Sequence, residues 1–437
     1  MSALGRPSRV LKGKGARDAP AAPLQLAAVG LEAEFELWLD GQRVKPEDVF
    51  ESPRQLIRGP LMHRRGTSYH LPTGGVIYFD TGVVELATPV IELARGCAAR
   101  AGRSLWESLL FLQRELDAWQ ARDGREARLV GFSTHYNVSF EAAGEMRPRV
   151  LSSALAKRSI GDLALLLAYL LPAPVMLLAT NRRSTGVGVR PRGDRLEVTA
   201  DFTPSSSLMI AAATVVIGIA REVMRWPSFD RAELAARGLP VIKGFHPCRH
   251  TSRRGWLARF DCYPRNPFTT GPDEEVWEVE EPFWRRRGET PRPLSLRRIA
   301  LEIARRFRLG IRRVSDPFTF RLIDAVLTGR TPSLLDLPDR PAAYEDVGRR
   351  AAWDNLFPDR VLERSRYERV LIRAISGRDL WLGGSAYKPV GMRGWSQVVF
   401  RRQPDGVRRV LSIDQLLTHL DDWELTSERQ ARSQRRL

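Results

Sequence analysis

The amino-acid sequence predicts an α+β fold in which helices cover a mainly antiparallel sheet. Segments that alternate between apolar and polar residues gather in the first half of the chain, and short turns join several of them. Segments with helical periodicity lie between these strands and dominate residues 295–376. Each helix has one apolar side, which it can bury against the apolar face of the sheet.

The individual elements follow from the same patterns. Pro172 and Pro174 interrupt a long apolar run, so a helix ends before them and a buried strand follows. Serines at 205–207 can cap the apolar helix that begins there. The predicted elements of the first half are a strand over 28–39, a strand–turn–strand over 76–90, a helix over 91–121, a strand over 128–140, a helix over 152–171, strands near 175–180 and 186–202, and a helix over 205–226.

The second half begins with a long irregular segment. Residues 244–294 are rich in Pro, Arg, Trp and acidic residues, which is typical of a functional loop or lid. Helices return after residue 295, and a hairpin is predicted to turn at residues 403–406. A helix with a capping box begins at Ser412, because Gln415 lies three residues further on.

We expect residues 27–425 to form a single large catalytic domain, between a disordered basic tail over 1–26 and a basic tail over 426–437. The most apolar run, residues 163–179, is shorter than the about 20 residues of a membrane-spanning helix and is broken by prolines. The first 26 residues lack the continuous apolar core of a signal peptide. A cytoplasmic protein without a membrane partner is therefore expected.

The net charge of +18 comes mostly from arginine. Such an excess fits a nucleic acid, a membrane surface or a phosphorylated ligand as partner, or an arginine-rich composition whose charges sit in water. The basic residues spread along the whole chain, so charge alone does not predict nucleic-acid binding. The three cysteines, Cys97, Cys248 and Cys262, are too few and too scattered for a disulfide framework, which favours a reducing compartment.

The first predicted strand carries an unusual row of carboxylates. In residues 29–41, VGLEAEFELWLDG, the side chains of Glu32, Glu34 and Glu36 share one face, and the opposite face is apolar. Neighbouring carboxylates on that face lie about 7 Å apart, which costs about 2 kcal/mol per pair at an effective dielectric of about 20. Bound cations would turn this repulsion into attraction.

Other predicted strands supply residues of the same kind. His135 and Asn137 lie two apart in STHYNVSF and so share a face. Carboxylates and an imidazole on rigid strands are suitable ligands for Mg²⁺ or Mn²⁺. The alternative is a sheet face in open water, but each of these strands is strongly apolar on its other side. The acidic residues of this group are Asp80 and Glu85 in FDTGVVELATP and Glu197 in DRLEVTADFTP.

Four motifs in this order, GLEAEFE, VVELATPV, GFSTHYNVS and RLEVTADFTP, resemble the glutamate–cysteine ligase and related carboxylate–amine ligase families. These families share the catalytic fold of glutamine synthetase, and the resemblance covers residues 28–205, about half of the chain. It implies an ATP-dependent enzyme with two or three Mg²⁺ or Mn²⁺ ions that joins a small-molecule carboxylate to an amine through an acyl phosphate. The C-terminal half resembles nothing that we can place.

The resemblance also implies roles for individual residues. One ion would be held by Glu32, His135 and Glu197, and a second by Glu34, Glu85 and Asp80. Glu34 and Glu197, together with Arg190, are the expected catalytic residues. Glu36 is additional to the family pattern, and we interpret it as a residue at the rim of the site.

Arginines in VGVRPRGDRLEV lead into the last motif. Arg190 and Arg192 alternate on the predicted strand, and a guanidinium group can bind phosphate or carboxylate oxygens with two hydrogen bonds. We expect Arg190, Arg192 and Asn137 to contact the cofactor. Many members of the family carry an arginine two residues after the last-motif glutamate, where this chain has Thr199. The substrates therefore need not be glutamate and cysteine.

Two other functions are consistent with the sequence. A non-catalytic protein on the same fold could bind a polyanion through the basic surface, and a phosphotransferase of the guanidino-kinase type could stop after phosphorylation. The segment GFHPCRH, with Cys262 nearby, has a zinc-like composition, but its spacing fits no common zinc site, and we expect loop residues without metal. Oligomers are compatible with the sequence.

Overall fold

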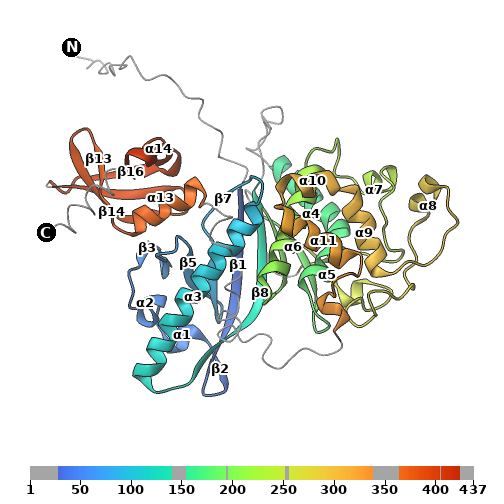
Figure 1. Cartoon of the computed structure of the whole chain (residues 1–437), viewed down its shortest axis with the longest axis horizontal. Coiled ribbons are helices and arrows are strands. Elements are labelled where there is room, and N and C mark those ends of the chain that lie inside the picture. Colours follow the sequence, from blue (N-terminus) through green and yellow to red (C-terminus); the bar gives the residue numbers. More distant parts are fainter. Residues whose placement is uncertain are drawn as a thin grey trace, which may run out of the picture.

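The computed structural model describes residues 28–139, 154–192, 195–250, 255–337, 364–403 and 405–423. These residues form a twelve-stranded sheet and a four-stranded sheet (Figure 1), and every strand pairing within them is antiparallel. Helices cover the large sheet, which confirms the predicted α+β class. The two predicted tails lie outside the described residues.

The large sheet has β1 and β8 at its centre. Its edge-to-edge order is β11 (Cys248–Arg249), β12 (Trp256–Arg259), β9 (Gly186–Pro191), β10 (Arg195–Asp201), β8 (Ala127–Ser139), β1 (Ala28–Leu39), β6 (Val83–Ala87), β5 (Val76–Asp80), β4 (Ser68–His70) and β3 (Met62–Arg65). Two short strands, β2 (Gln42–Val44) and β7 (Ile91–Glu92), pair with the two ends of β1.

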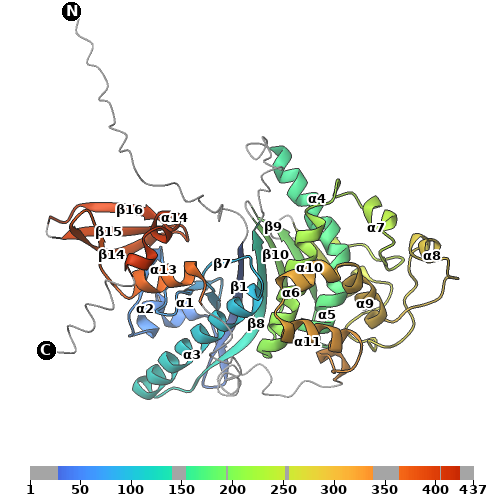
Figure 2. The ribbon, with the colours of Figure 1, turned by 45° about the horizontal axis from the view of Figure 1, so that its top comes forward.

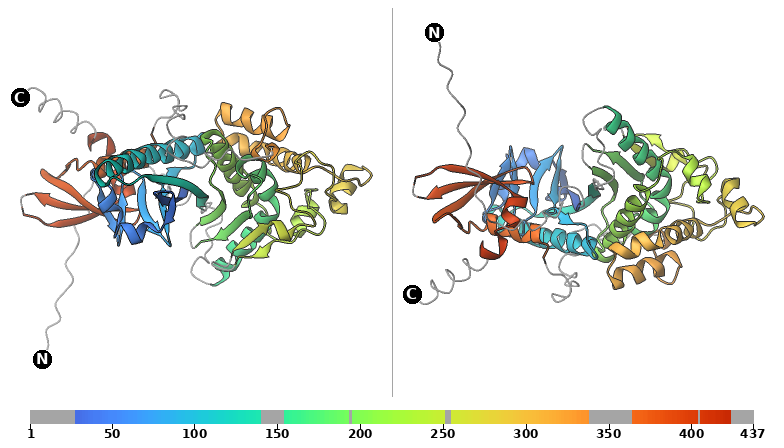
Figure 3. Two further views of the ribbon diagram at one scale, coloured as in Figure 1. Left: turned by 90° about the horizontal axis from the view of Figure 1, so that it is seen from below. Right: turned by 90° about the horizontal axis from the view of Figure 1, so that it is seen from above.

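Helices pack on one face of this sheet. The long helices α3 (Cys97–Asp123) and α6 (Ser206–Val223) contact each other and the central strands, and α4 (Ala154–Leu170) contacts β9 and β12 (Figure 2). A second layer packs against α5 (Pro172–Ala179) and α6 (Figure 3). Its members are α9 (Leu296–Arg306), α10 (Arg308–Val314) and α11 (Pro317–Leu327). The shorter helices are α1 (Pro46–Val49), α2 (Pro53–Leu56), α7 (Ala232–Ala236), α8 (Glu281–Arg287), η1 (Phe260–Cys262) and η2 (Leu334–Asp336).

Strand β1 shows how the sequence pattern becomes a buried face. Its residues alternate strictly between buried and half-buried positions. The apolar residues Leu31, Ala33, Phe35 and Leu37 are at most 2% exposed and belong to the main core. Burying a leucine or phenylalanine side chain stabilises a fold by about 1.5–3 kcal/mol, so this face fixes the register of the central strand. The glutamates therefore point to the opposite face.

A β-bulge at Phe132 changes the alternation within β8. Before the bulge, Leu129 and Gly131 pair with core residues of β1, whereas after it Ser133 pairs with Glu34 and His135 with Glu32. Without the extra residue, odd-numbered positions would stay on the core side throughout the strand. The bulge is thus what brings His135 to the carboxylate face.

Three predicted elements differ from the structure. The single strand predicted over 186–202 is a pair of antiparallel strands, β9 and β10. Residues Pro172–Ala179 form helix α5, not a strand, and all eight are buried. A short apolar run of this kind cannot be assigned to helix or strand by periodicity, and proline at the first helical position favours a helix start. Helix α3 begins at Cys97, not at residue 91, because Ile91–Glu92 pair with β1 as β7.

Helix α6 is the one described helix that is long and apolar enough to cross a membrane, and 78% of its most apolar window is buried inside the protein. The bent pair Ile160–Leu170 and Pro172–Ala179, with 60° between its two helices, passes the same test of composition when it is taken as one span. Ser205 caps α6 by accepting a hydrogen bond from the amide of Leu208, as predicted.

The segment predicted as a long loop or lid contributes to the main core. It contains β11, β12, η1 and α8. Most of its aromatic side chains pack inside the protein, and Trp277 and Trp284 are at most 2% exposed. Phe245 stacks on Tyr263 with ring centroids 4.2 Å apart.

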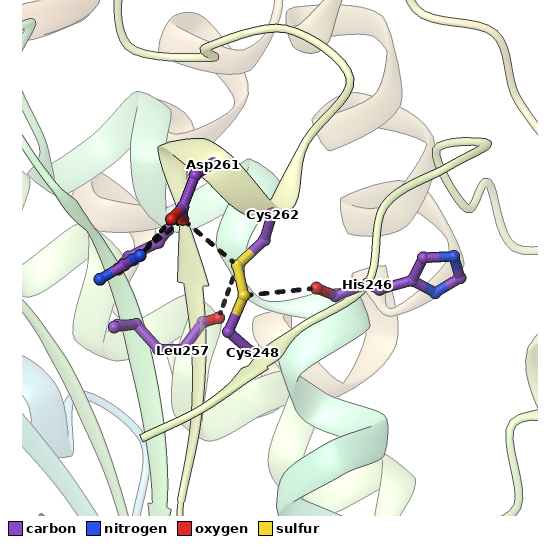
Figure 4. The surroundings of a disulfide bond; sticks show 6 residues. His246, Cys248, Leu257, Asp261 and Cys262 are labelled. Carbon is purple, nitrogen blue, oxygen red and sulfur yellow. Dashed lines mark hydrogen bonds and ion pairs between the residues drawn. A yellow bond between two sulfur atoms is a disulfide. The ribbon is translucent and has the colours of Figure 1, made fainter. Parts of the chain in front are cut away.

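One disulfide, between Cys248 and Cys262, joins β11 to the end of η1 (Figure 4). The sequence did not predict this bond, because fourteen residues of irregular sequence separate the two cysteines. The two cysteines that gave this segment its zinc-like composition are the ones that form the disulfide. The ring of His246 points away from that bond (Figure 4). Cys97 is free and buried.

Residues 364–423 form a second sheet with its own hydrophobic core. Its elements are α13 (Arg366–Ile375), β13 (Leu380–Leu382), β14 (Ser385–Arg393), β15 (Gln397–Gln403), β16 (Arg408–Ser412) and α14 (Ile413–Leu417). The predicted hairpin between β15 and β16 and the capping box of Ser412 with Gln415 are confirmed. An ion pair between Arg103 of α3 and the buried Glu368 joins this unit to the rest, with 3.2 Å between Nη2 and Oε1.

Candidate metal centre

The carboxylate face of the large sheet forms a cleft of about 700 Å³. Because the other face packs against α3 and α6, this face is open to ligands. The lining is mostly polar and contains both signs of charge. It comprises Glu32, Glu34, Tyr78, Asp80, Glu85, Phe132, Ser133, His135, Thr185, Gly186, Arg190, Arg192, Arg195, Thr199, Ala200, Asp201, His250 and Leu257.

Strand register places the predicted residues in adjacent rows across the sheet. One row runs Tyr78, Glu85, Glu34, Ser133 and Asp201, on β5, β6, β1, β8 and β10. The next row contains Glu32, His135, Thr199 and Gly188, and a third contains Asn137, Glu197 and Arg190. Paired residues of antiparallel strands share a face and lie about 4.5–5.5 Å apart, so register alone brings distant segments together.

The first predicted ligand set comes together in space. The ligand atoms of Glu32, His135 and Glu197 all lie within 4.8 Å of one another. His135 Nδ1 is 3.2 Å from Glu32 Oε2 and 3.9 Å from Glu197 Oε1. Glu197 is fully buried, and the other two are largely buried.

A second set shares the same histidine. Glu34, Glu85 and His135 also place their ligand atoms within 4.8 Å of one another. His135 Nε2 lies 3.6 Å from Glu34 Oε1, and the hydroxyl of Ser133 donates a hydrogen bond of 2.6 Å to Glu34 Oε2. A neutral imidazole has one lone pair for a metal, so His135 can serve only one of the two sets at a time.

The charges around His135 shift its pKa and that of Glu32 in opposite directions. Burial acts to lower the pKa of His135, but its hydrogen bond to Glu32 and the charges of Glu34 and Glu197 outweigh burial and raise it. Burial likewise acts to raise the pKa of Glu32, and the hydrogen bond and charge of His135 instead hold it below its ordinary value. The imidazole and the carboxylates therefore favour each other's charged forms.

Glu85 is the carboxylate that keeps its proton most strongly. Burial and the nearby charge of Glu32 raise the pKa of Glu85 to about 8, and the hydroxyl of Tyr78 donates to its Oε1. The pKa of Tyr78 is raised by burial and by the charges of Glu32 and Glu85. A divalent cation at this position would release the proton of Glu85, because metal ligands must be deprotonated.

Arginines hold the fully buried carboxylate of Glu197. Arg190 forms an ion pair with Oε1, and Arg192 Nε donates to Oε2 at 2.6 Å. A buried carboxylate needs such partners, because removing a charge from water costs several kcal/mol. Each carboxylate oxygen has two lone pairs, so Oε1 can bind a cation and Arg190 together. Arg190 and Arg192 thus lie directly beside the first ligand set.

Three residues that the sequence singled out belong to neither set. Asp80 lines the cleft at the end of β5, where its carboxylate accepts a hydrogen bond of 2.8 Å from Thr81. Asn137 accepts a hydrogen bond of 2.9 Å from Arg195 and does not line the cleft. Glu36 pairs with Arg43 at 3.0 Å and lies outside the lining, so it is separate from the ligand cluster.

Sequence patterns missed several residues of the cleft. Tyr78, Ser133 and Arg195 contact predicted ligands or their partners, and Phe132 lines the cleft from the bulge. Ser133 lies two residues before His135, so a period of two could have found it. The bulge residue has no such signal, because an inserted residue breaks the period.

The donor atoms of both sets fit Mg²⁺ or Mn²⁺. Carboxylate oxygens dominate, which suits hard divalent cations, and the single imidazole favours Mn²⁺ over Ca²⁺. The carboxylates of Glu34 and Glu85 are also held in orientation for a cation, because the hydroxyls of Ser133 and Tyr78 donate hydrogen bonds to them.

Neither a protein family nor a curated protein matches this sequence. Among solved structures, a chain of the crystal structure of the complex between prokaryotic ubiquitin-like protein Pup and its ligase PafA is similar over 91% of this chain and 92% of that chain. The identity is 10% and the TM-score is 0.46. At this level the likeness carries no conclusion about the site or the activity of this chain.

Proposed function

We propose that the protein is an ATP- and Mg²⁺-dependent carboxylate–amine ligase. The observation that carries the proposal is the pair of ligand sets, Glu32–His135–Glu197 and Glu34–Glu85–His135, whose members line one cleft except for the fully buried Glu197. Because His135 serves one set at a time, the carboxylates of the other set would hold the second of the cations that phosphoryl transfer needs around the phosphates. The resemblance of the four sequence motifs to carboxylate–amine ligases supports the same reaction.

The reaction has two steps. A carboxylate oxygen of the acid attacks the γ-phosphorus of ATP, the bond to the β-phosphate oxygen breaks, and ADP leaves. The nitrogen of the amine then attacks the acyl carbon, phosphate leaves with the bonding electrons, and the amine loses a proton. Bound cations would neutralise charge on the phosphate oxygens. Arg190 and Arg192, already beside Glu197, are the side chains that we assign to phosphate contact.

Substrate recognition in this chain departs from the family pattern at Thr199. Thr199 lines the cleft opposite His135 on the next strand. Gly188, its other neighbour, leaves room for the threonine, because a Cβ there would lie 2.3 Å from Thr199 Oγ1. A small neutral side chain replaces the expected arginine at this point, so we do not assign glutamate as the acid.

The test is an ADP-release screen of the full chain over amino acids and amines, with Mg²⁺ or Mn²⁺, followed by mass analysis of products. The proposal predicts ADP, phosphate and an amide for one acid–amine pair. Glu34→Gln and Glu197→Gln should abolish turnover, whereas the matched variant Glu36→Gln should retain it, since Glu36 pairs with Arg43 outside the cleft. Undiminished turnover in Glu34→Gln and Glu197→Gln would refute the proposed site. ADP release with a phosphorylated product and no amide would instead indicate the phosphotransferase.

A second candidate function, polyanion binding, is favoured by the C-terminal sheet. Lys388, Arg401 and Arg408 are exposed and directly paired across β14, β15 and β16. Like charges paired across strands destabilise a sheet, and no ion pair joins these three to another described residue. This function predicts nucleic-acid affinity that falls steeply with salt and drops in the Arg401→Gln variant, without metal-dependent ATP turnover.

A further inference from the structure

We infer that the end of the cleft formed by Phe132 and Asp201 binds the ammonium group of an amine that carries an apolar or aromatic substituent. The inference names the amine class of the proposed ligase and rests on that function for its place in the reaction. The binding itself needs neither ATP nor turnover.

Phe132 presents an aromatic ring to the cleft. It is the residue inserted by the β-bulge in β8, and it is 51% exposed. Bulges occur beside active sites, where they redirect a side chain. An exposed phenylalanine among charged groups is unfavourable in water, and a ligand with an apolar group would cover it.

The core holds the bulge in place. The ring of Phe202 packs where a Cβ of Gly131 would be, at 2.1 Å, so only glycine fits there. Phe202 also makes an edge contact with Phe35, with ring centroids 5.1 Å apart. Its amide donates to the carbonyl oxygen of Phe132 at 3.3 Å, which ties the bulge to β10. The position of Phe132 is therefore built into the fold.

Asp201 supplies a carboxylate to the same cleft. It pairs with Ser133, the residue after Phe132, and it lines the same cleft. The side-chain amide of Asn181 donates to Oδ2 at 3.2 Å and orients the carboxylate. A carboxylate beside an aromatic face is the combination that binds ammonium groups, through an ion pair and a cation–π interaction.

The surroundings set this end apart from the first ligand set and its arginines. Asp201 lies four residues along β10 from Glu197, about 13 Å in an extended strand, and Arg190 and Arg192 pair with Glu197. In the same row of the sheet, Ser133 lies between Asp201 and Glu34 of the second ligand set. Gly186 and Leu257 also line the cleft. A cationic amine here would thus lie beside the second ligand set and away from Arg190 and Arg192.

Calorimetric titration of the full chain with phenethylammonium tests the inference, with Mg²⁺ in excess so that the other carboxylates are occupied. Saturable binding is expected. Phenethyl alcohol, the uncharged analogue, should bind about tenfold more weakly, and Asp201→Asn should weaken phenethylammonium by a similar factor. Phe132→Leu should weaken it severalfold, whereas Phe132→Tyr, which keeps the ring, should restore binding. Phe260→Leu, at an exposed phenylalanine outside the cleft, should change nothing.

The inference would be overturned by an absence of saturable binding, by equal binding of the alcohol, or by full affinity in Asp201→Asn and Phe132→Leu. If Asp201→Asn fails to fold, the affinities of Phe132→Leu and Phe132→Tyr for phenethylammonium still test the inference. Failure of the ADP-release screen would leave these binding results unaffected, so the two proposals fail independently.

Discussion

His135 and Glu32 face each other across β8 and β1, with Nδ1 of the imidazole 3.2 Å from Oε2 of the carboxylate. This contact joins two segments that lie 103 residues apart in the chain. It places one nitrogen of His135 toward the Glu32–Glu197 set and leaves the other toward Glu34. These carboxylates raise the pKa of His135, and only its deprotonated nitrogen can bind a cation.

Metal binding should release protons. Burial with the charge of Glu32 raises the pKa of Glu85 to about 8, so Glu85 holds a proton at neutral pH, and the carboxylates around His135 raise the pKa of its imidazole. Mn²⁺ affinity should rise as pH increases from about 6 to 8, with release of about one to two protons per chain. Calorimetry in buffers of different ionisation enthalpy counts these protons. The Glu85→Gln variant should release about one proton fewer on binding Mn²⁺. An Mn²⁺ affinity that does not change with pH would contradict the assignment of Glu85 and His135 as ligands.

The bulge should be sensitive to a single methyl group. Gly131→Ala places a Cβ within 2.1 Å of the Phe202 ring, and such overpacking costs about 1–3 kcal/mol of unfolding free energy. Because the same bulge brings His135 to the cleft, Mn²⁺ affinity should fall as well. Gly161→Ala in α4 meets nothing within 4 Å and serves as the control, which should be neutral or stabilising. Chemical denaturation measures both, and equal stability of the two variants would argue against a fixed bulge.

Acid should destabilise the fold through His70. Its side chain is fully buried, and burial with the charge of Arg64 lowers its pKa to about 3. The unfolded chain takes up this proton near pH 6.5, so stability is complete above that pH and is lost as pH falls toward 3, by up to about 1.4 kcal/mol per pH unit.

The advantage of the wild-type chain over His70→Asn in unfolding free energy should therefore shrink between pH 7 and pH 5. A constant difference for His70→Asn would show that His70 is not buried as a neutral ring.

The disulfide should stabilise the edge of the large sheet. Closing a loop of about 15 residues restricts the unfolded chain by about 3 kcal/mol. A double variant, Cys248→Ser with Cys262→Ser, should unfold at a lower denaturant concentration. A reductant should destabilise the wild-type chain and leave the double variant unchanged. Equal stability of reduced and oxidised wild-type protein would mean that β11 is held by other contacts.

The sequence predicted which side chains share a face of a strand better than it predicted which strands pair with each other. A period of two placed Glu32 with Glu34, and His135 with Asn137, because side-chain direction in a strand is a local property. The order of β1, β8 and β10 is a long-range property, and only the resemblance to known ligases implied that these residues meet. In the structure Asn137 is not part of the lining of the cleft, and its side-chain oxygen accepts a hydrogen bond from Arg195.

Other features depend on contacts that no local pattern encodes. The bulge at Phe132 depends on Phe202, the residue after β10, and the disulfide depends on the approach of β11 to η1. The apolar run of α5 satisfies helix and strand patterns equally, and its burial decides nothing between them. The ion pairs of Glu197 with Arg190 and Arg192 needed the pairing of β9 with β10.

The most direct test of the metal centre is a titration of the full chain with Mn²⁺, followed by electron paramagnetic resonance of the free ion. Wild-type protein should bind the ion, and Glu32→Gln and Glu34→Gln should each weaken binding by about 10–100-fold. Glu36→Gln, on the same face of the same strand but paired with Arg43, should bind as wild type does. Equal Mn²⁺ affinity in all four proteins would contradict a metal centre at this cleft.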